Sequence, residues 1–317
     1  MSDRAGPITI LNADALTALR AIPDESVHCC VTSPPYWGLR NYGHDGQMGL
    51  ESTPDEYVAK MVEVFREVRR VLADDGTLWL NLGDSYANDG KWGGSSGGKH
   101  VAALHGNSGI GRGKQNTGLK PKDLIGIPWR VAFALQADGW WLRQDIIWHK
   151  PNPMPESVTD RCTKAHEYIF LLTKSARYYY DAGAISEAQS ETSGGFQSRG
   201  KRGDTSHGDG EETARLQRPV GSYNGTRNRR SVWTVATQPY PGAHFATFPP
   251  KLIEPCILAG CPEGGTVLDP FGGSGTTAQV ARNHGRRAIS IDLNPDYATL
   301  HTKRLGEGHL LAPNDTQ

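Results

Sequence analysis

The sequence lacks an excess of charge of either sign, because its 34 Lys and Arg residues balance its 34 Asp and Glu residues. A general affinity for a polyanion is therefore not expected, and any nucleic-acid surface would have to come from local clusters. The sequence also lacks a run of 18 apolar residues and an N-terminal apolar segment of the secretory kind. We therefore expect a soluble, cytoplasmic protein with no membrane partner.

Cysteine is scarce and is not spaced for metal binding. No two cysteines stand at C-x-x-C spacing, which disfavours a zinc site and a disulfide framework. We expect reduced, packed thiols and no metal ion at Cys29, Cys30, Cys162, Cys256 and Cys261. Glycine, with 38 residues, and tryptophan, with 8, are plentiful, which fits a packed core that carries long loops.

Between these loops the apolar pattern alternates between the strand and the helix period, which predicts an α/β fold with a mostly parallel sheet. The longest predicted helix has Thr53 as its N-cap candidate and Pro54 at its first position, and its period ends at Gly76. Strands are predicted in 7–12, 26–32, 77–86, 266–270 and 287–293, a hairpin in 140–152 and 166–181, and helices in 15–23, 53–76, 123–139, 251–260, 276–285 and after 293.

Two segments interrupt this rhythm. Residues 87–122 have no periodicity and hold six Lys or Arg residues against one acidic residue, Asp89. Residues 184–243 are polar and glycine-rich and hold eight Lys or Arg residues. Segments this long inside a domain are either functional or without fixed structure, and charge runs are often no more than solvated loops.

A strand, a glycine turn and a helix start follow one another in T-V-L-D-P-F-G-G-S-G-T-T-A. Residues 273–278 match G-x-G-x-x-A, which suggests a nucleotide site, although a tight packing turn is the plainer alternative. Asp269 ends the strand before the glycines, where a carboxylate repels phosphate but pairs with an ammonium group. Asp292 ends the next strand, where it can accept both hydroxyls of a ribose. An acid for an amino group and an acid for a ribose fit S-adenosylmethionine better than NAD.

A second motif, Ser33-Pro34-Pro35-Tyr36, follows the strand that ends at Thr32; we call this turn the catalytic corner. An exocyclic amino group on a base is a weak nucleophile, and two acceptors for its protons would turn its lone pair toward a methyl donor. The Ser33 hydroxyl and the Pro34 carbonyl can serve as these acceptors, and Tyr36 can stack on the base. A simple strand-ending turn is the alternative.

The two motifs together resemble the amino-methyltransferases that modify exocyclic nitrogens of DNA bases. T-S-P-P-Y at 32–36 precedes D-P-F-G-G-S-G-T-T at 269–277, which looks like the circularly permuted β-class order. The resemblance covers most of 8–180 and 244–305. It implies a Rossmann-like methyltransferase fold, with helices on both faces of the sheet and a β-hairpin, and S-adenosylmethionine as cofactor.

By this resemblance, Thr32 borders the methyl group, as does Pro34, and Phe248 belongs to a segment that encloses the methionine part. The acid beside the adenine is Asp14. Asp292 departs from the family, which often has Glu there, and Phe271 is as readily explained by core packing. The cofactor residues implied are Asp14, Thr32, Phe248, Asp269, Phe271, Gly273, Ser274, Gly275, Thr276 and Asp292, and the catalytic residues are Ser33, Pro34, Pro35 and Tyr36.

The target base of a duplex must be flipped out to reach such a corner. By resemblance, the catalytic domain comprises 1–183 and 244–317, and 184–243 is a target-recognition insert that binds double-stranded DNA; 87–122 is a second, mobile candidate. A homodimer is left open. Phosphate and guanine contacts are expected from Arg199, Lys201, Arg202, Arg227, Arg229 and Arg230.

Ser at position 33 favours N4 of cytosine by resemblance, with N6 of adenine as the alternative. A nicotinamide-dependent oxidoreductase is a distant alternative, against which Asp269 argues. A DNA-binding protein without activity, and a methyltransferase of RNA or of protein glutamine, also remain open at this point.

Overall fold

The structure is a computed structural model that describes residues 7–38, 46–87, 119–188, 225–238 and 248–295, together with 297, 300, 309 and 310. Much of the predicted recognition insert 184–243 and of the segment 87–122 lies outside these residues. The same holds for Arg199, Lys201 and Arg202. The division into a catalytic domain and an insert therefore stays a prediction.

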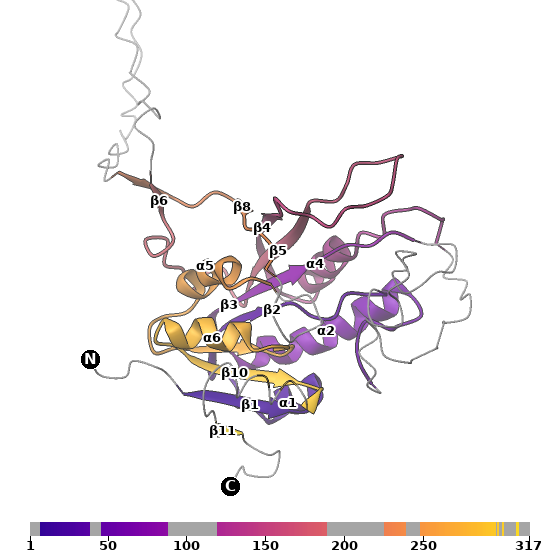
Figure 1. Cartoon of the computed structure of the whole chain (residues 1–317). Helices are drawn as coiled ribbons and strands as arrows, with labels where there is room; N and C mark the ends of the chain where they lie inside the picture. Colours follow the sequence, from indigo (N-terminus) through magenta and orange to yellow (C-terminus); the bar gives the residue numbers. More distant parts are fainter. Residues whose placement is uncertain are drawn as a thin grey trace, which may run out of the picture.

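A nine-stranded sheet occupies the centre of the described chain, in the order β11-β1-β10-β9-β2-β3-β5-β4-β8 (Figure 1). The strands from β11 to β3 pair in parallel, whereas β5 is antiparallel to both β3 and β4. The predicted mostly parallel sheet and hairpin are thus confirmed. Its strands are β1 (Ile8–Asn12), β2 (Val27–Thr32), β3 (Leu72–Leu82), β4 (Trp141–His149), β5 (His166–Thr173), β8 (Val232–Thr234), β9 (Thr266–Asp269), β10 (Arg287–Asp292) and β11 (His309–Leu310).

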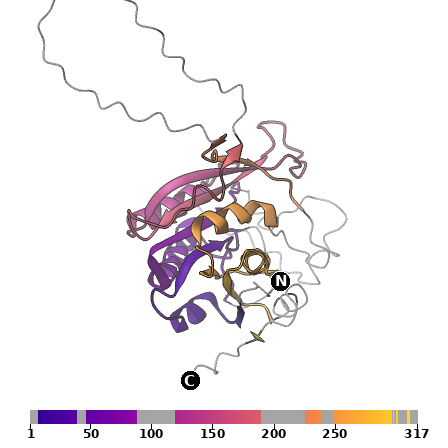
Figure 2. The ribbon, with the colours of Figure 1, turned by 90° about the vertical axis from the view of Figure 1, so that its left-hand side faces the viewer.

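Helices cover both faces of this sheet (Figure 2). The helices α1 (Ala15–Ala21), α2 (Pro54–Val71) and α4 (Ile127–Ala137) share one buried cluster with Cys30 and Leu78. The helices α5 (Pro250–Gly260) and α6 (Thr276–Asn283) share another, on the opposite face, with Cys29 and Trp79. Because neighbouring residues of β2 and β3 face two apolar layers, these strands read as almost continuous apolar runs.

The long helix α2 begins as predicted, with the Thr53 side chain accepting a hydrogen bond from the Glu56 N–H at 3.2 Å. Its end at Gly76 was predicted wrongly, because the helix stops at Val71 and Leu72 already has extended backbone angles. Leu72 is fully buried and pairs with Val27 of β2, so sheet pairing prevails over the helical period there. Tertiary contacts commonly override local preference in this way.

The segment predicted as an insert is partly integrated into the catalytic sheet. The strand β8 extends the sheet beside β4, and its Trp233 is buried beside Trp79 of β3. The short strands β6 (Glu187–Ala188) and β7 (Thr226–Arg227) pair with each other in a separate two-stranded sheet. Among the described residues, β8 therefore joins this segment to the catalytic sheet, whereas β6 and β7 do not.

The cysteines are unpaired, and all except Cys162 are buried, as expected for packed thiols. Burial raises the pKa of Cys261 to about 12. Within the described ranges, no helix combines the length and apolar character needed to cross a bilayer, and no group of three or more potential metal-ligating side chains occurs.

The strand order places β2 next to β9, with Cys30 opposite Leu268. From β2 the chain continues through α2, on one face of the sheet, and from β9 it continues through α6, on the other face. The two connections therefore diverge at the carboxyl ends of this strand pair. Such a switch point leaves a crevice where α/β proteins bind their ligands.

Candidate active site

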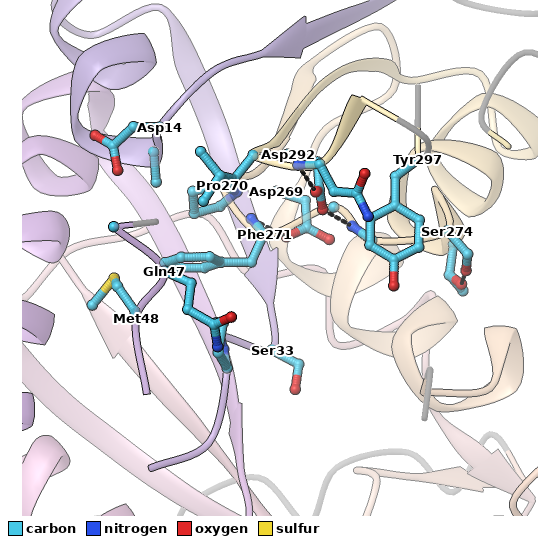
Figure 3. Close-up of a pocket in the computed structure, with 18 of the residues that line it drawn as sticks. Asp14, Ser33, Gln47, Met48, Asp269, Pro270, Phe271, Ser274, Asp292 and Tyr297 are labelled. Atoms are coloured by element: carbon cyan, nitrogen blue, oxygen red, sulfur yellow. Dashed lines mark hydrogen bonds between the residues drawn. The ribbon is translucent and has the colours of Figure 1, made fainter. Parts of the chain in front are cut away.

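A pocket opens at this switch point, and it collects residues from segments that are far apart in the sequence (Figure 3). In the view of Figure 3, Phe271 lies between Asp14 and Met48 on one side and Ser274 on the other. Lining residues that were predicted as site residues are Asp14, Ser33, Pro35, Phe248, Asp269, Phe271, Gly273, Ser274, Thr276 and Asp292.

Asp269 is the buried centre of the pocket wall, with only 2% of its surface exposed. Its carboxylate accepts hydrogen bonds from the hydroxyls of Thr32 at 2.7 Å and Thr277 at 2.6 Å, and from the Phe271 N–H at 3.1 Å. Burial raises the pKa of Asp269 to about 6, although these hydrogen bonds oppose the shift. All three donors are neutral, so no cation among the described residues compensates the charge of this carboxylate.

Asp292, the last residue of β10, sits at the next strand end and is tied to the glycine loop. Its two carboxylate oxygens accept the N–H groups of Gly273 and Asn294, each at 2.8 Å. Burial is again the main cause that raises its pKa, to about 6. Since a carboxylate offers about four acceptor positions, two remain for hydroxyl donors.

The glycine loop needs glycine for its backbone angles. Gly273 has φ +51° and Gly275, the N-cap of α6, has φ +77°, a region that other residues rarely adopt. The Gly275 N–H donates to the Gly272 carbonyl at 2.8 Å, which closes the turn. The turn therefore places the backbone N–H of Gly273 against the Asp292 carboxylate in the pocket wall.

The Ser33 hydroxyl is oriented from behind by Tyr36. It donates to the Tyr36 hydroxyl at 3.3 Å, and the Tyr36 hydroxyl in turn donates to the Glu167 carboxylate at 2.8 Å. Burial, and then the charge of Glu167, raise the pKa of Tyr36 well above its usual value, so the phenol stays protonated. The lone pairs of Ser33 are thereby left to accept protons on the pocket side.

The ring of Tyr36 is fixed by neighbours that the sequence analysis missed. Asn81 of β3 lies 3.1 Å from its hydroxyl. A Cβ atom at Gly83 would lie 2.6 Å from the Tyr36 ring carbon Cε2, so only glycine allows the ring this position. Glu167 is also paired with Lys150 of the β4–β5 hairpin. The only feature of the sequence that could have pointed to Glu167 is its place, as an acidic residue, near the start of a largely apolar strand.

Four of the predicted residues are not on the pocket surface. Thr32 is fully buried and is connected to the pocket through its hydrogen bond to Asp269. Gly275, Pro34 and Tyr36 are next to lining residues in the sequence but do not themselves line the pocket. Several lining residues were not predicted, among them Gln47, Met48 and Tyr297. Gln47 and Met48 stand in a glycine-rich turn whose spacing carries no signal of a ligand.

Of the predicted DNA-binding residues, only Arg227, Arg229 and Arg230 are described. Arg230 and Arg227 lie 3.1 and 3.5 Å from Glu187. Burial raises the pKa of Glu187, but the hydrogen bonds and charge of Arg230, together with the charge of Arg227, outweigh burial, so the pKa is lowered overall. The Arg229 guanidinium carbon lies 4.8 Å from the ring centre of Trp233. These arginines therefore lie next to Glu187 and to Trp233 of β8, and none of them lines the pocket.

The raised pKa values of Asp269 and Asp292 predict a pH-dependent stability. In the unfolded chain both acids ionise near pH 4, whereas in the folded protein they keep their protons until about pH 6. Their contribution to stability is therefore present below about pH 4 and is lost, by a few kcal/mol, as the pH rises through about 6.

Urea unfolding of the ligand-free protein between pH 4.0 and 7.5 measures this loss. The free energy of unfolding should fall less steeply with pH in the double variant Asp269→Asn, Asp292→Asn than in the unchanged protein. Equal slopes in the two proteins would contradict the assignment.

Comparison with known proteins agrees with this geometry. The DNA methylase family N6_N4_Mtase matches residues 27–303. The chain is 48% identical to the type II methyltransferase M.Cfr9I of Citrobacter freundii, over 94% of this chain and 87% of the relative. It is 46% identical to the type II methyltransferase M.SmaI of Serratia marcescens, over 93% and 90% of the two chains.

Solved structures show the same fold. PvuII DNA methyltransferase (cytosine-N4-specific) superposes with a TM-score of 0.64 at 19% identity, over 99% of this chain and 89% of that one. The putative DNA modification methylase TTHA0409 from Thermus thermophilus, in complex with S-adenosyl-L-methionine, gives a TM-score of 0.56 at 23% identity, over 96% and 99% of the chains. The oxidoreductase alternative is thereby overturned. The chain belongs to the DNA methylase family of S-adenosylmethionine-dependent amino-methyltransferases.

Proposed function

We propose that this DNA methyltransferase methylates N4 of a cytosine that it has flipped out of double-stranded DNA. The observation that carries the proposal is the Ser33 hydroxyl, which lies on the pocket surface and whose proton is directed away from the pocket, to Tyr36. A hydroxyl held in this way is an acceptor for an amino proton of the base. The Pro34 carbonyl is proposed as the second acceptor.

The acids of the pocket would hold the cofactor, as their surroundings suit its parts. Asp269 would pair with the methionine ammonium group, because its protein donors are all neutral. Asp292 would accept the ribose hydroxyls with its remaining acceptor positions, and Asp14 would lie beside the adenine. S-adenosylmethionine, when bound, supplies a methyl group on a positively charged sulfur.

The rest of the predicted set would shape this site without charge. Gly273 and its neighbours let the cofactor approach the backbone, while Phe248 and Phe271 offer apolar contact on the pocket wall. Thr32 and Thr277 would hold the Asp269 carboxylate in one orientation. Preorganised groups of this kind lower the cost of reaching the transition state, so the reaction needs no strong base.

The choice of cytosine rests on Ser33, since both cytosine and adenine offer an amino group that needs two acceptors. In the family that the chain resembles, Ser at this position is typical of cytosine N4 enzymes. The PvuII enzyme, a cytosine-N4-specific DNA methyltransferase, shares the fold. Adenine N6 is the alternative product.

On the DNA side, the Tyr36 ring would stack on the extruded base, and stacking of this kind offsets part of the cost of unpairing it. Arg227 and Arg230 would exchange their contacts with Glu187 for DNA phosphates. Arg199, Lys201 and Arg202 lie outside the described residues, and their role in DNA binding stays a prediction.

Transfer of a radiolabelled methyl group to plasmid DNA, followed by nucleoside chromatography, tests the proposal. The label is expected in 4-methylcytosine. The variant Ser33→Ala should lose about 100-fold or more in turnover, since it removes one preorganised acceptor, while its affinity for S-adenosylmethionine changes by less than about twofold. Label in 6-methyladenine would overturn the base assignment, and an unimpaired Ser33→Ala enzyme would overturn the role of Ser33.

The variant Gly83→Ala should slow methyl transfer about tenfold or more, because its Cβ atom would displace the Tyr36 ring and misplace the groups that depend on it. Cofactor binding should be retained, as Gly83 does not line the pocket. Single-turnover kinetics and calorimetric titration measure the two effects. Gly183→Ala is the matched control, since its Cβ would approach only the Asp181 carboxylate, at 3.3 Å. Full activity of Gly83→Ala would show that the position of Tyr36 is not critical.

A further inference from the structure

The loop of residues 150–165, between β4 and β5, projects from the sheet at the edge that holds the active site (Figure 1). The strand β5 is antiparallel to β3 and to β4, so β4 ends at the same edge as β3 and its parallel neighbour β2. The base of the loop is connected to the Ser33-Pro34-Pro35-Tyr36 turn through Glu167. Lys150 is ion-paired with Glu167, and Glu167 accepts the hydrogen bond of Tyr36.

This loop carries a strongly exposed apolar side chain. Met154 is 87% exposed, more than any other large apolar residue in the described part of the chain, the next being Val232 at 59%. A single exposed apolar residue on a surface needs no special explanation. Met154, however, is exposed in a loop whose base is connected to the catalytic corner, and its backbone is held rigidly.

The backbone around Met154 is stiffened by its sequence, Pro151-Asn152-Pro153-Met154-Pro155. Each proline fixes its own φ and restricts the residue before it. Four residues of extended chain span at most about 14 Å, which limits how far Met154 can lie from Lys150.

Side-chain contacts hold both arms of the loop. The Asn152 amide exchanges two hydrogen bonds with the Thr237 backbone, at 3.0 and 3.2 Å. The Arg161 guanidinium carbon lies 3.9 Å from the centre of the Tyr86 ring, and Lys164 donates to the Asp84 carbonyl at 2.9 Å. The loop therefore presents Met154 on a fixed support, although it has no apolar core of its own.

We propose that Met154 is a wedge that enters the DNA stack at the position vacated by the target base. Apolar side chains, Met among them, are used in this way by other DNA-binding proteins, where they offset the cost of unstacking. The inference rests on the proposed function, in that a base must leave the duplex to reach Ser33. Under this proposal, the β4–β5 loop keeps the target base outside the duplex, while the pocket holds the groups that carry out methyl transfer.

The test compares two duplexes that carry the methylated site mapped from plasmid DNA, one fully paired and one with an abasic site opposite the target base. Single-turnover methylation by Met154→Ala is expected to be about tenfold slower than by the unchanged enzyme on the paired duplex. On the abasic duplex the loss should shrink to less than about twofold, because the target base is no longer held by pairing.

Two further variants separate the wedge from general damage to the loop. Met154→Leu keeps an apolar side chain of similar size and should restore most of the rate on the paired duplex. Val158→Ala, in the same loop, should leave both rates unchanged. S-adenosylmethionine affinity should be the same in all of these proteins.

Equal losses for Met154→Ala on both duplexes, or no loss on either, would overturn the proposal. So would a change in the oligomeric state of Met154→Ala without any dependence on the duplex, since that result would assign the loop to a contact between copies of this chain. Failure of the proposed function is distinguishable, because the unchanged enzyme would then place no label in 4-methylcytosine, whatever Met154→Ala does.

Discussion

The parallel pairing of β2 with β9 is the constraint on which the site depends. These strands are distant in the sequence, yet their pairing brings the Thr32 hydroxyl to 2.7 Å from the Asp269 carboxylate. Ser33 follows Thr32 directly, and the glycine loop follows Asp269. One strand pair therefore places the proposed acceptor for the base beside the proposed partner of the cofactor, and transfer between two ligands needs this adjacency.

Burial of the Asp269 carboxylate disfavours its ionised form and at the same time strengthens its attraction to a cationic partner. Asp269 is nearly inaccessible, and burial raises its pKa to about 6. A carboxylate in this state gains more from a cationic partner than an exposed one would, because water screens it less. The corner at Ser33 works differently: a chain of hydrogen bonds through Tyr36 and Glu167 orients it without placing a charge in the pocket.

The sequence predicted the elements that local patterns encode. Most strands and helices, the N-cap at Thr53 and the two motifs were visible, as were most of the pocket residues that stand next to those motifs. The short strands β6, β7, β8 and β11 were not predicted. The sequence did not predict the end of α2, because sheet pairing of Leu72 decides it. It also missed Glu167, Asn81 and Gly83, whose roles come only from their contact with Tyr36 across neighbouring strands. Gln47 and Met48 reach the pocket from a turn that has no ligand-binding pattern.

The most direct measurement of the central claim is a binding cycle at Asp269. Calorimetric titration at pH 7.5 would compare S-adenosylmethionine with an analogue that lacks the α-amino group, on the unchanged protein and on Asp269→Asn. If Asp269 pairs with the ammonium group, the unchanged protein should prefer S-adenosylmethionine by about tenfold or more, and Asp269→Asn should lose that preference. Equal affinity of the unchanged protein for the two ligands, or a preference that survives in Asp269→Asn, would contradict the account.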